Sequence, residues 1–417
     1  MAPTTAQLSE LAVLLKELLT FAYPADAVIS HYFRAHPDIG RRDRAFIAET
    51  AYSILRHLRS LEAAVDSQRP RDLIIAWFAR LSGLNLRECE GIVHTNELDR
   101  YKAAKAFDLA AAPAAIRLDL PAWLEAPLTT QYGDRLPALM QALNSNAPLD
   151  LRVNSLKLSR DKALEQMLAD GFAATATPHS PLGIRLTNKP PLNQYPLFQE
   201  GALEVQDEGS QLLALLTGAR RGEMVCDFCA GAGGKTLALG AMMANSGRLY
   251  AFDTAEKRLA RMKPRLARSG LSNVHPQVLA SENDQKVKRL AGKFDRVLVD
   301  APCSGLGTLR RNPDLKWRQN EVGLTELTAK QTLILNSAAR LVKVGGTLIY
   351  ATCSLLKAEN QDIVDAFLNT HPGFSVQPVS ETLRRIGADL DTGDHLTLAP
   401  DLHGTDGFFA TILQRTA

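Results

Sequence analysis

Cysteine is scarce in this chain of 417 residues, which holds only five, an odd number. So few cysteines argue against a disulfide framework, and we expect reduced thiols. The first ten residues lack a basic segment followed by an apolar run, which is not the pattern of a secretory signal. No apolar run is long enough to cross a bilayer. These absences predict a cytoplasmic protein that binds no membrane.

A large excess of charge is lacking as well. The net charge is +3, with 22% charged and 46% hydrophobic residues, which is ordinary for a globular protein. Because there is no global basic field, any surface for nucleic acid must be a local patch. The length allows two or three domains, each with its own core.

The first third of the chain shows helical periodicity and no convincing strand before residue 145. We predict an all-helical domain over residues 1–140, with helical runs at 8–19, 45–65, 73–81 and 86–98 and a connector at 110–121. The basic run Arg41–Arg44 is interpreted as a solvated helix N-terminus, with a phosphate-contacting patch as the alternative.

The middle of the chain predicts a small α/β subdomain over residues 145–200. A strand is expected at 149–156, a helix at 160–170 and a second strand at 183–186. Arg152 and Asn154 are either RNA contacts or ordinary outward-facing strand residues, and the sequence leaves both readings open.

From residue 201 to 417 helices and strands alternate, which predicts a doubly wound α/β domain. A strand at 223–228 leads into a glycine-rich loop, and the next strand, 248–252, ends at Asp253. The loop fails the phosphate-loop pattern at Cys229 and the dinucleotide pattern at Thr236. A carboxylate at the end of the second strand suits ribose hydroxyls. The combination favours S-adenosylmethionine over ATP or NAD.

Two further patterns in this domain remain weak. Cys226 and Cys229 form a C-x-x-C pair, but no further ligands lie nearby in the sequence, so we predict no metal site. The helix after Asp253 carries six basic residues: Lys257, Arg258, Arg261, Lys263, Arg265 and Arg268. They are either a solvated face or a local RNA-binding surface.

The strongest chemical signal is a pair of cysteines, Cys303 and Cys353, that each follow a predicted strand and precede a serine. Either cysteine alone is better explained as a small buried residue, but the two together favour chemistry at the carboxyl edge of the sheet. A thiolate that adds to carbon 6 of cytosine makes carbon 5 nucleophilic. A second thiol can then assist release, with Asp300 near N3 of the ring. The residues alone do not say which cysteine attacks.

These residues resemble the RNA 5-methylcytosine methyltransferase family, which includes ribosomal RNA small subunit methyltransferase B and the Fmu, Sun and Nop2 proteins. The matching pieces span most of the C-terminal half: residues 227–236, 300–305, 307–314, Lys316-Trp317, 350–354, Glu359-Asn360 and 406–410. The resemblance implies that Cys353 is the nucleophile and that Cys303 assists product release. It places Asp300 and Lys235 in the active site, with Lys235 hydrogen-bonded there.

The resemblance also implies a set of residues for S-adenosylmethionine: Cys229, Ala230, Gly231, Ala232, Gly233, Gly234, Lys235, Asp253 and Asp300. Two departures from the family pattern are visible. Gly231-Ala232 replaces Ala-Pro in the loop, and no aspartate stands after the third strand, where we assign Glu282 to the adenine instead.

The helical third is similar to the NusB-like RNA-binding domain of the ribosomal branch of the family, and the middle segment to its RNA-recognition-like subdomain. This implies a monomeric enzyme that methylates carbon 5 of a cytosine in RNA, with 16S ribosomal RNA favoured. The alternatives are a transfer RNA cytosine methyltransferase, a DNA cytosine methyltransferase, against which Cys353 argues, and a non-catalytic NusB-like scaffold.

Overall fold

The computed structural model describes residues 3–85, 87–89, 91–388, 390 and 392–417. The chain divides into two compact units. The helical unit comprises Met1–Asn146 together with Thr308–Glu321, and the sheet unit comprises Ala147–Gly307 together with Val322–Ala417. The three sequence domains at 1–140, 145–200 and 201–417 remain predictions. In the described residues no helix is long and apolar enough to span a membrane.

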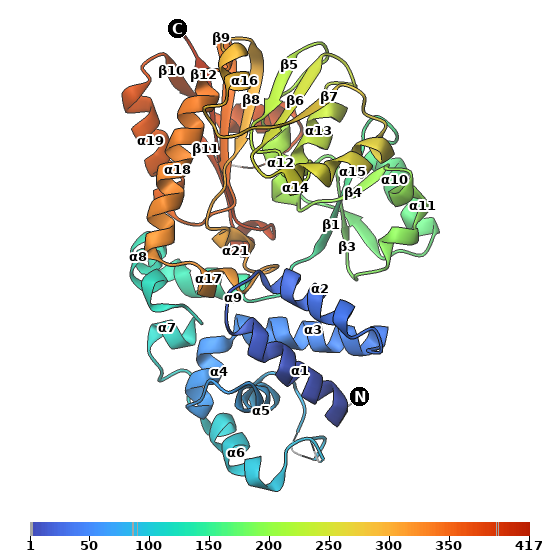
Figure 1. Ribbon diagram of the computed structural model, residues 1–417, viewed down its shortest axis with the longest axis vertical. Helices are drawn as coiled ribbons and strands as arrows, with labels where there is room; N and C mark the ends of the chain where they lie inside the picture. Colours follow the sequence, from blue (N-terminus) through green and yellow to red (C-terminus); the bar gives the residue numbers. More distant parts are fainter. Residues whose placement is uncertain (1–2, 86, 90, 389, 391) are drawn as a thin grey trace. The chain divides into compact units, whose positions relative to one another are not determined.

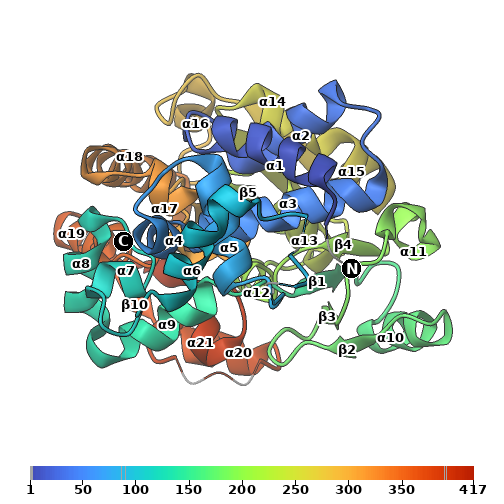
Figure 2. The ribbon, with the colours of Figure 1, turned by 90° about the horizontal axis from the view of Figure 1, so that it is seen from below.

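The helical unit contains α1 (Thr5–Leu18), α2 (Ala25–Ala35), α3 (Arg41–Arg56), α4 (Leu58–Val65), α5 (Pro70–Arg80), α6 (Leu98–Ala106), α7 (Ala114–Arg117), α8 (Ala122–Tyr132) and α9 (Leu136–Leu143). Helix α1 begins with a capping box between Thr4 and Gln7, and its buried leucines pack against α2 and α3 (Figure 2). The prediction of a helix over residues 86–98 is wrong for the residues of that range that the structure describes. A short 3₁₀ turn, Thr95–Glu97, lies there, and α6 begins only at Leu98.

The segment Thr308–Glu321 comes from the C-terminal half of the sequence but packs in the helical unit. Within it α17 (Leu315–Arg318) places Trp317 against the helical core, where the indole Nε1 donates to the carbonyl of Leu55 at 2.8 Å. The Asp314 carboxylate accepts the backbone N–H of Ala25 at 3.1 Å. The chain therefore leaves the sheet unit directly after Gly307 and returns at Val322.

The sheet unit contains a small antiparallel sheet ordered β2-β3-β1-β4, formed by β2 (Ala174–Ala176), β3 (Gly183–Leu186), β1 (Leu149–Val153) and β4 (Leu203–Val205). Helices α10 (Arg160–Ala169) and α11 (Pro196–Gln199) complete a β-α-β-β-α-β order. The predicted separation of this subdomain from the main sheet is confirmed, although the short strand β4 was not predicted.

The main sheet is ordered β10-β12-β9-β8-β5-β6-β7, with β11 paired to β12. Its parallel strands are β5 (Met224–Asp227), β6 (Arg248–Asp253), β7 (Val274–Val278), β8 (Phe294–Asp300) and β9 (Val342–Thr352). The antiparallel strands are β10 (Phe374–Gln377), β11 (His395–Leu398) and β12 (Phe408–Arg415). Chain order reverses at β5, and ligands of open α/β sheets bind at such a switch point.

Helices cover both faces of the main sheet, as Figure 1 shows. One face packs against α16 (Gln285–Arg289), α18 (Glu321–Ala339) and α19 (Gln361–Thr370), and the other against α12 (Glu208–Leu215), α13 (Gly234–Met242) and α20 (Val379–Arg385). Helices α14 (Glu256–Ala260) and α15 (Met262–Ser269) follow β6, and α21 (Pro400–His403) precedes β12. The predicted doubly wound α/β architecture is confirmed.

Candidate active site

The glycine loop between β5 and α13 needs backbone conformations that only glycine adopts readily. Gly231 and Gly233 have φ values of 54° and 86°. A Cβ at Gly231 would lie 2.7 Å from Nη2 of Arg258, and one at Gly233 would lie 2.5 Å from Cγ of Met262. At both positions a side chain would meet a strained backbone conformation and a close neighbour, which at Gly233 is the buried Met262.

Asp253, the last residue of β6, holds this loop in place. Its Oδ2 accepts the N–H of Gly231 and its Oδ1 accepts the N–H of Ala255, both at 2.7 Å. Although its carboxylate is mostly buried, Asp253 also lines the cavity at the sheet edge. Each carboxylate oxygen retains a further lone pair for a ligand hydroxyl.

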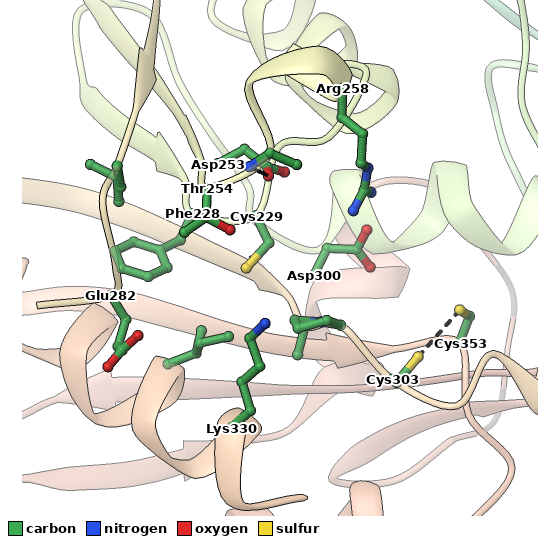
Figure 3. A pocket seen from close by; sticks show the side chains of 15 residues that line it. Phe228, Cys229, Asp253, Thr254, Arg258, Glu282, Asp300, Cys303, Lys330 and Cys353 are labelled. Carbon is green, nitrogen blue, oxygen red and sulfur yellow. Dashed lines mark hydrogen bonds between the residues drawn. The ribbon is translucent and has the colours of Figure 1, made fainter. Parts of the chain in front are cut away.

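A cavity of about 480 Å³ opens at the carboxyl ends of these strands. Figure 3 shows its labelled side chains, including the apolar ring of Phe228 and the carboxylate of Glu282 on the same side. Of the predicted residues, the cavity is lined by Cys229, Asp253, Glu282, Asp300, Cys303 and Cys353. Its size lies within the roughly 300–1,000 Å³ of small-molecule pockets.

The small sheet holds the glycine loop from outside. Arg152 is buried and its Nη1 donates to the carbonyl of Gly234 at 2.7 Å and to the Gln206 side chain. Arg265 donates to the carbonyl of Ala232 at 2.7 Å and pairs with the buried Glu204. The reading of Arg152 as an RNA contact is therefore wrong, because its guanidinium is used inside the protein.

Other basic and polar candidates are also engaged internally. Asn154 is buried and donates to the carbonyls of Gly201 and Ser269. Arg268 pairs with Glu204 and lies over the ring of Phe198, whereas Lys257, Arg261 and Lys263 remain exposed. The six-residue basic run is thus partly structural, and only its exposed members could contact RNA.

Lys235, in the first turn of α13, reaches across to Asp300 at the end of β8. Its Nζ lies 2.7 Å from Oδ2 of Asp300. Burial alone would lower the pKa of Lys235, but the charge of Asp300 and the hydrogen bond to it outweigh burial and raise that pKa above its ordinary value. The ammonium therefore stays charged and is directed at Asp300 instead of at a phosphate.

Asp227, the last residue of β5, is buried beneath the loop. Its Oδ2 accepts the hydroxyl of Thr236 at 2.6 Å, while no donor in the described residues reaches Oδ1. Burial raises the pKa of Asp227 to about 7. Burial also raises the pKa values of Cys226 and Cys229. These thiols remain protonated, and no cluster of metal-ligating side chains exists in the described residues.

Cys303 and Cys353 come together because β8 and β9 are neighbouring parallel strands, with Asp300 opposite Ala351. Their sulfur atoms lie 3.4 Å apart, and both side chains are half-buried (Figure 3). The hydrogen bond with Cys353 and burial raise the pKa of Cys303 well above its ordinary value. The contact places both sulfur atoms within reach of one another at the carboxyl edge of the sheet.

The structure also brings in residues that sequence reasoning missed. Lys330 of α18 and Arg258 of α14 line the cavity, and Figure 3 shows Arg258 extending towards Asp300. Arg258 belonged to a predicted basic face, and nothing in its spacing set it apart. Conversely, five residues shape the loop without lining the cavity: Ala230, Gly231, Ala232, Gly233 and Gly234. Lys235 does not line the cavity either, but it donates to Asp300, which does.

The strand order, the glycine loop and the acidic residue ending the second strand define the fold of S-adenosylmethionine-dependent methyltransferases. Residues 214–414 match the family model of the 16S rRNA methyltransferase RsmB/F, and residues 120–193 match the RsmF/B-like ferredoxin-like domain. The chain belongs to this RsmB/F methyltransferase family.

Individual relatives agree with that membership. The chain is 31% identical to a probable ribosomal RNA small subunit methyltransferase B of Synechocystis, over 94% of this chain and 95% of that protein. A methyltransferase homologue from Pyrococcus horikoshii shares 27% identity and a TM-score of 0.62, covering 72% of this chain and 97% of the other. NSun6 from the same organism, solved with SFG, shares the fold at 19% identity, covering 71% and 98%, with a TM-score of 0.62.

Proposed function

We propose that this protein transfers a methyl group from S-adenosylmethionine to carbon 5 of a cytosine in 16S ribosomal RNA. The observation that carries the proposal is the pair of sulfur atoms of Cys303 and Cys353, 3.4 Å apart at the carboxyl edge of the sheet. Neither a DNA methyltransferase with a single active thiol nor a non-catalytic scaffold accounts for that pair. The names of the relatives favour ribosomal over transfer RNA.

The cavity fits S-adenosylmethionine. Asp253 lines the cavity where ribose hydroxyls would bind, and Leu279 and Phe228 offer an apolar wall for adenine. Glu282 is the proposed partner of the adenine amino group. The structure of NSun6 with SFG, an analogue of the methyl donor, is consistent with this assignment. When bound, the cofactor supplies an electrophilic methyl group.

Cys353 is proposed to attack carbon 6 of the cytosine ring. The S–C6 bond forms as the C5–C6 double bond opens, and the electron pair moves to carbon 5 and N3. Asp300, held by Lys235 at 2.7 Å, is proposed to give a proton to N3 as negative charge develops there and to take it back once carbon 5 is methylated. Carbon 5 would take the methyl group that a bound cofactor supplies, with the methyl–sulfur bond broken and the thioether released.

Cys303 is proposed to complete the cycle by moving two protons. Its thiol gives its hydrogen to the sulfur of Cys353 as the S–C6 bond breaks, and the resulting Cys303 thiolate takes the proton from carbon 5. The C5–C6 double bond is restored, and Cys353 later loses its proton to solvent. The raised pKa of Cys303 supports its starting state as a neutral thiol.

Trapping the covalent intermediate tests this proposal. Cys303→Ala, incubated with S-adenosylmethionine and a 16S rRNA transcript, is expected to accumulate a protein–RNA adduct on a denaturing gel, because attack proceeds and release does not. Cys353→Ala is expected to form no adduct and to lose methylation. Absence of an adduct, together with undiminished methylation by Cys353→Ala, would disprove the mechanism.

Two further measurements address the substrate. Methyl transfer to RNA is expected to exceed transfer to DNA of the same sequence. Bisulfite sequencing of RNA from cells with and without the gene is expected to reveal one cytosine of 16S rRNA that loses its methyl group. A lost signal in transfer RNA instead would assign the protein to the transfer RNA alternative.

A further inference from the structure

Each of the two cysteines is followed by a buried serine. Ser304 and Ser354 are 1% and 2% exposed, and their hydroxyl oxygens lie 3.1 Å apart. The strand register ends at Asp300 and Ala351, and beyond it the backbone N–H of Gly307 donates to the carbonyl of Cys353 at 2.8 Å. Side-chain contacts add to this bond in joining the two cysteine loops.

One carboxylate accepts hydrogen bonds from the serines of both loops. Glu359, in the 3₁₀ turn Lys357–Glu359 after β9, is fully buried. Its Oε1 accepts the N–H of Ser304 at 2.8 Å, and its Oε2 accepts the hydroxyls of Ser304, at 2.5 Å, and of Ser354. The same carboxylate therefore holds the residue after each cysteine.

A fourth donor extends the arrangement to the preceding residue. Nε2 of Gln331 in α18 donates to Oε1 of Glu359 at 2.9 Å and to the carbonyl of Pro302 at 3.0 Å. All four donors to Glu359 are neutral. Hydrogen bonds to an ionised acceptor are shorter and stronger than those between neutral groups. A buried carboxyl group is costly unless it is hydrogen-bonded, and these four bonds satisfy Glu359 in one position.

We propose that Glu359 is a positioning residue for the two-cysteine reaction: it fixes the Cys303 loop to the Cys353 loop so that the sulfurs stay within reach throughout the cycle. This inference rests on the proposed function. Glu359 touches neither sulfur and acts through Ser304 and Ser354. The sulfur of Cys353 must bond to carbon 6 and later accept a proton from Cys303. A displacement of either sulfur by about 1 Å costs roughly 100-fold in rate.

Two substitutions separate position from folding. Glu359→Ala removes all four hydrogen bonds, so kcat is expected to fall roughly 100-fold. Glu359→Gln keeps a carbonyl oxygen for the N–H of Ser304 and Gln331, while its amide can donate to serine hydroxyls that rotate to accept. This conservative variant is expected to restore kcat to within about 10-fold of the wild type, because one decade corresponds to little more than the worth of one hydrogen bond.

Glu208→Ala provides a matched control in the same unit. Glu208 is also a fully buried carboxylate, and it accepts the N–H groups of His179 and Ser180 at 2.5 and 2.7 Å, away from the cavity. It differs from Glu359 in pairing with a cation, Arg185, at 3.5 Å. The Glu208→Ala variant is expected to have a melting temperature lowered about as much as that of Glu359→Ala. Below that temperature it is expected to keep the wild-type kcat. Calorimetric affinities for S-adenosylmethionine and KM for RNA should be unchanged in both Glu359 variants.

The outcomes distinguish this inference from the proposed function. If the Cys303→Ala and Cys353→Ala variants behave as proposed while folded Glu359→Ala keeps wild-type kcat, Glu359 has no positioning role. The same conclusion follows if Glu359→Ala and Glu208→Ala lose activity equally, or if Glu359→Gln is as slow as Glu359→Ala. If neither cysteine variant changes methylation, the proposed function itself fails, whatever Glu359 does.

Discussion

Two lysines, the half-buried Lys235 of the sheet unit and the fully buried Lys316 of the helical unit, differ in their partners. Lys235 in the sheet unit donates to the carboxylate of Asp300 at 2.7 Å, and its pKa is raised. Lys316 in the helical unit donates to the carbonyl of Arg56 at 2.8 Å and to Oδ1 of Asn144 at 3.0 Å, and burial lowers its pKa to about 8. Both side chains belong to motifs of the same family.

The difference shows what burial and pairing each do. Transfer of an ammonium from water to the interior disfavours its charge, and neutral oxygens compensate only in part. A carboxylate within hydrogen-bond distance reverses the direction of the shift. The sheet unit thus keeps a fixed cation beside Asp300, where charge develops in the proposed reaction, whereas the helical unit keeps a lysine that can lose its proton.

The largest expected effect is on catalysis. Lys235→Met removes the cation that orients Asp300 and should lower kcat by about 100-fold, the scale for loss of a preorganised group at a developing charge. Asp300→Asn should be similarly slow, and the double variant should be no slower than the slower single one. Lys316→Met is the control, and its kcat should change less than about threefold. Equal losses from Lys235→Met and Lys316→Met would remove the functional distinction.

Asp227 sharpens the comparison, because it is a buried charge of the sheet unit whose hydrogen-bond partner is a neutral hydroxyl. Its pKa is about 7 in the folded protein against 3.8 for the ordinary group. Between these values the folded chain holds a proton that the unfolded chain has lost, so stability falls as pH rises from about 4 to 7. Across this pH range the free energy of unfolding of Asp227→Asn should rise relative to that of the wild type by up to about 4 kcal/mol.

Thermal unfolding of both forms at pH 5 and pH 8 measures that difference. The two melting temperatures should lie closest at pH 5, where Asp227 is protonated in the folded protein, and diverge at pH 8 in favour of Asp227→Asn. A constant difference at both values would mean that the Asp227 carboxylate is stabilised by a partner, as the Lys235 ammonium is.

The sequence predicted the reactive groups of this site better than the residues that hold those groups in position. Strand patterns ending at Cys303, Cys353 and Asp253 predicted groups at one sheet edge, because side chains that follow parallel strands share an edge. The roles of the two thiols came from family resemblance and remain proposals. The match to the NusB-like domain is likewise still a prediction.

Long-range contacts could not be read from local pattern. Arg152 alternates like an outward-facing strand residue, yet the glycine loop, 82 positions later, covers it. Segment 308–321 follows a catalytic motif but packs among helices formed by the first 146 residues. Glu359 follows Cys353 by only a few residues, but it also accepts a hydrogen bond from Ser304, which belongs to the Cys303 loop. Each contact depends on tertiary packing that neither periodicity nor spacing encodes.

The smallest expected effect concerns Lys316, and the protein carries its own probe. All three tryptophans, Trp77, Trp123 and Trp317, belong to the helical unit, and Nζ of Lys316 lies 5.0 Å from the centre of the Trp317 ring. Intrinsic fluorescence therefore reports unfolding of this unit. Between pH 8 and 10.5 the unfolded chain keeps the Lys316 proton and the folded chain does not, so stability should rise with pH by up to about 3 kcal/mol.

Lys316→Met removes this slope. The variant leaves the carbonyl of Arg56 and the side-chain oxygen of Asn144 without the ammonium, a loss of about 1–3 kcal/mol that offsets the relief of a buried charge at pH 7. The melting temperature of the wild type should therefore rise relative to that of Lys316→Met as the pH increases from 8 to 10. If the difference in melting temperature, followed by fluorescence, stays constant over that range, Lys316 stays charged in the folded protein, as Lys235 does. A carboxylate partner would then not explain the difference between the two lysines.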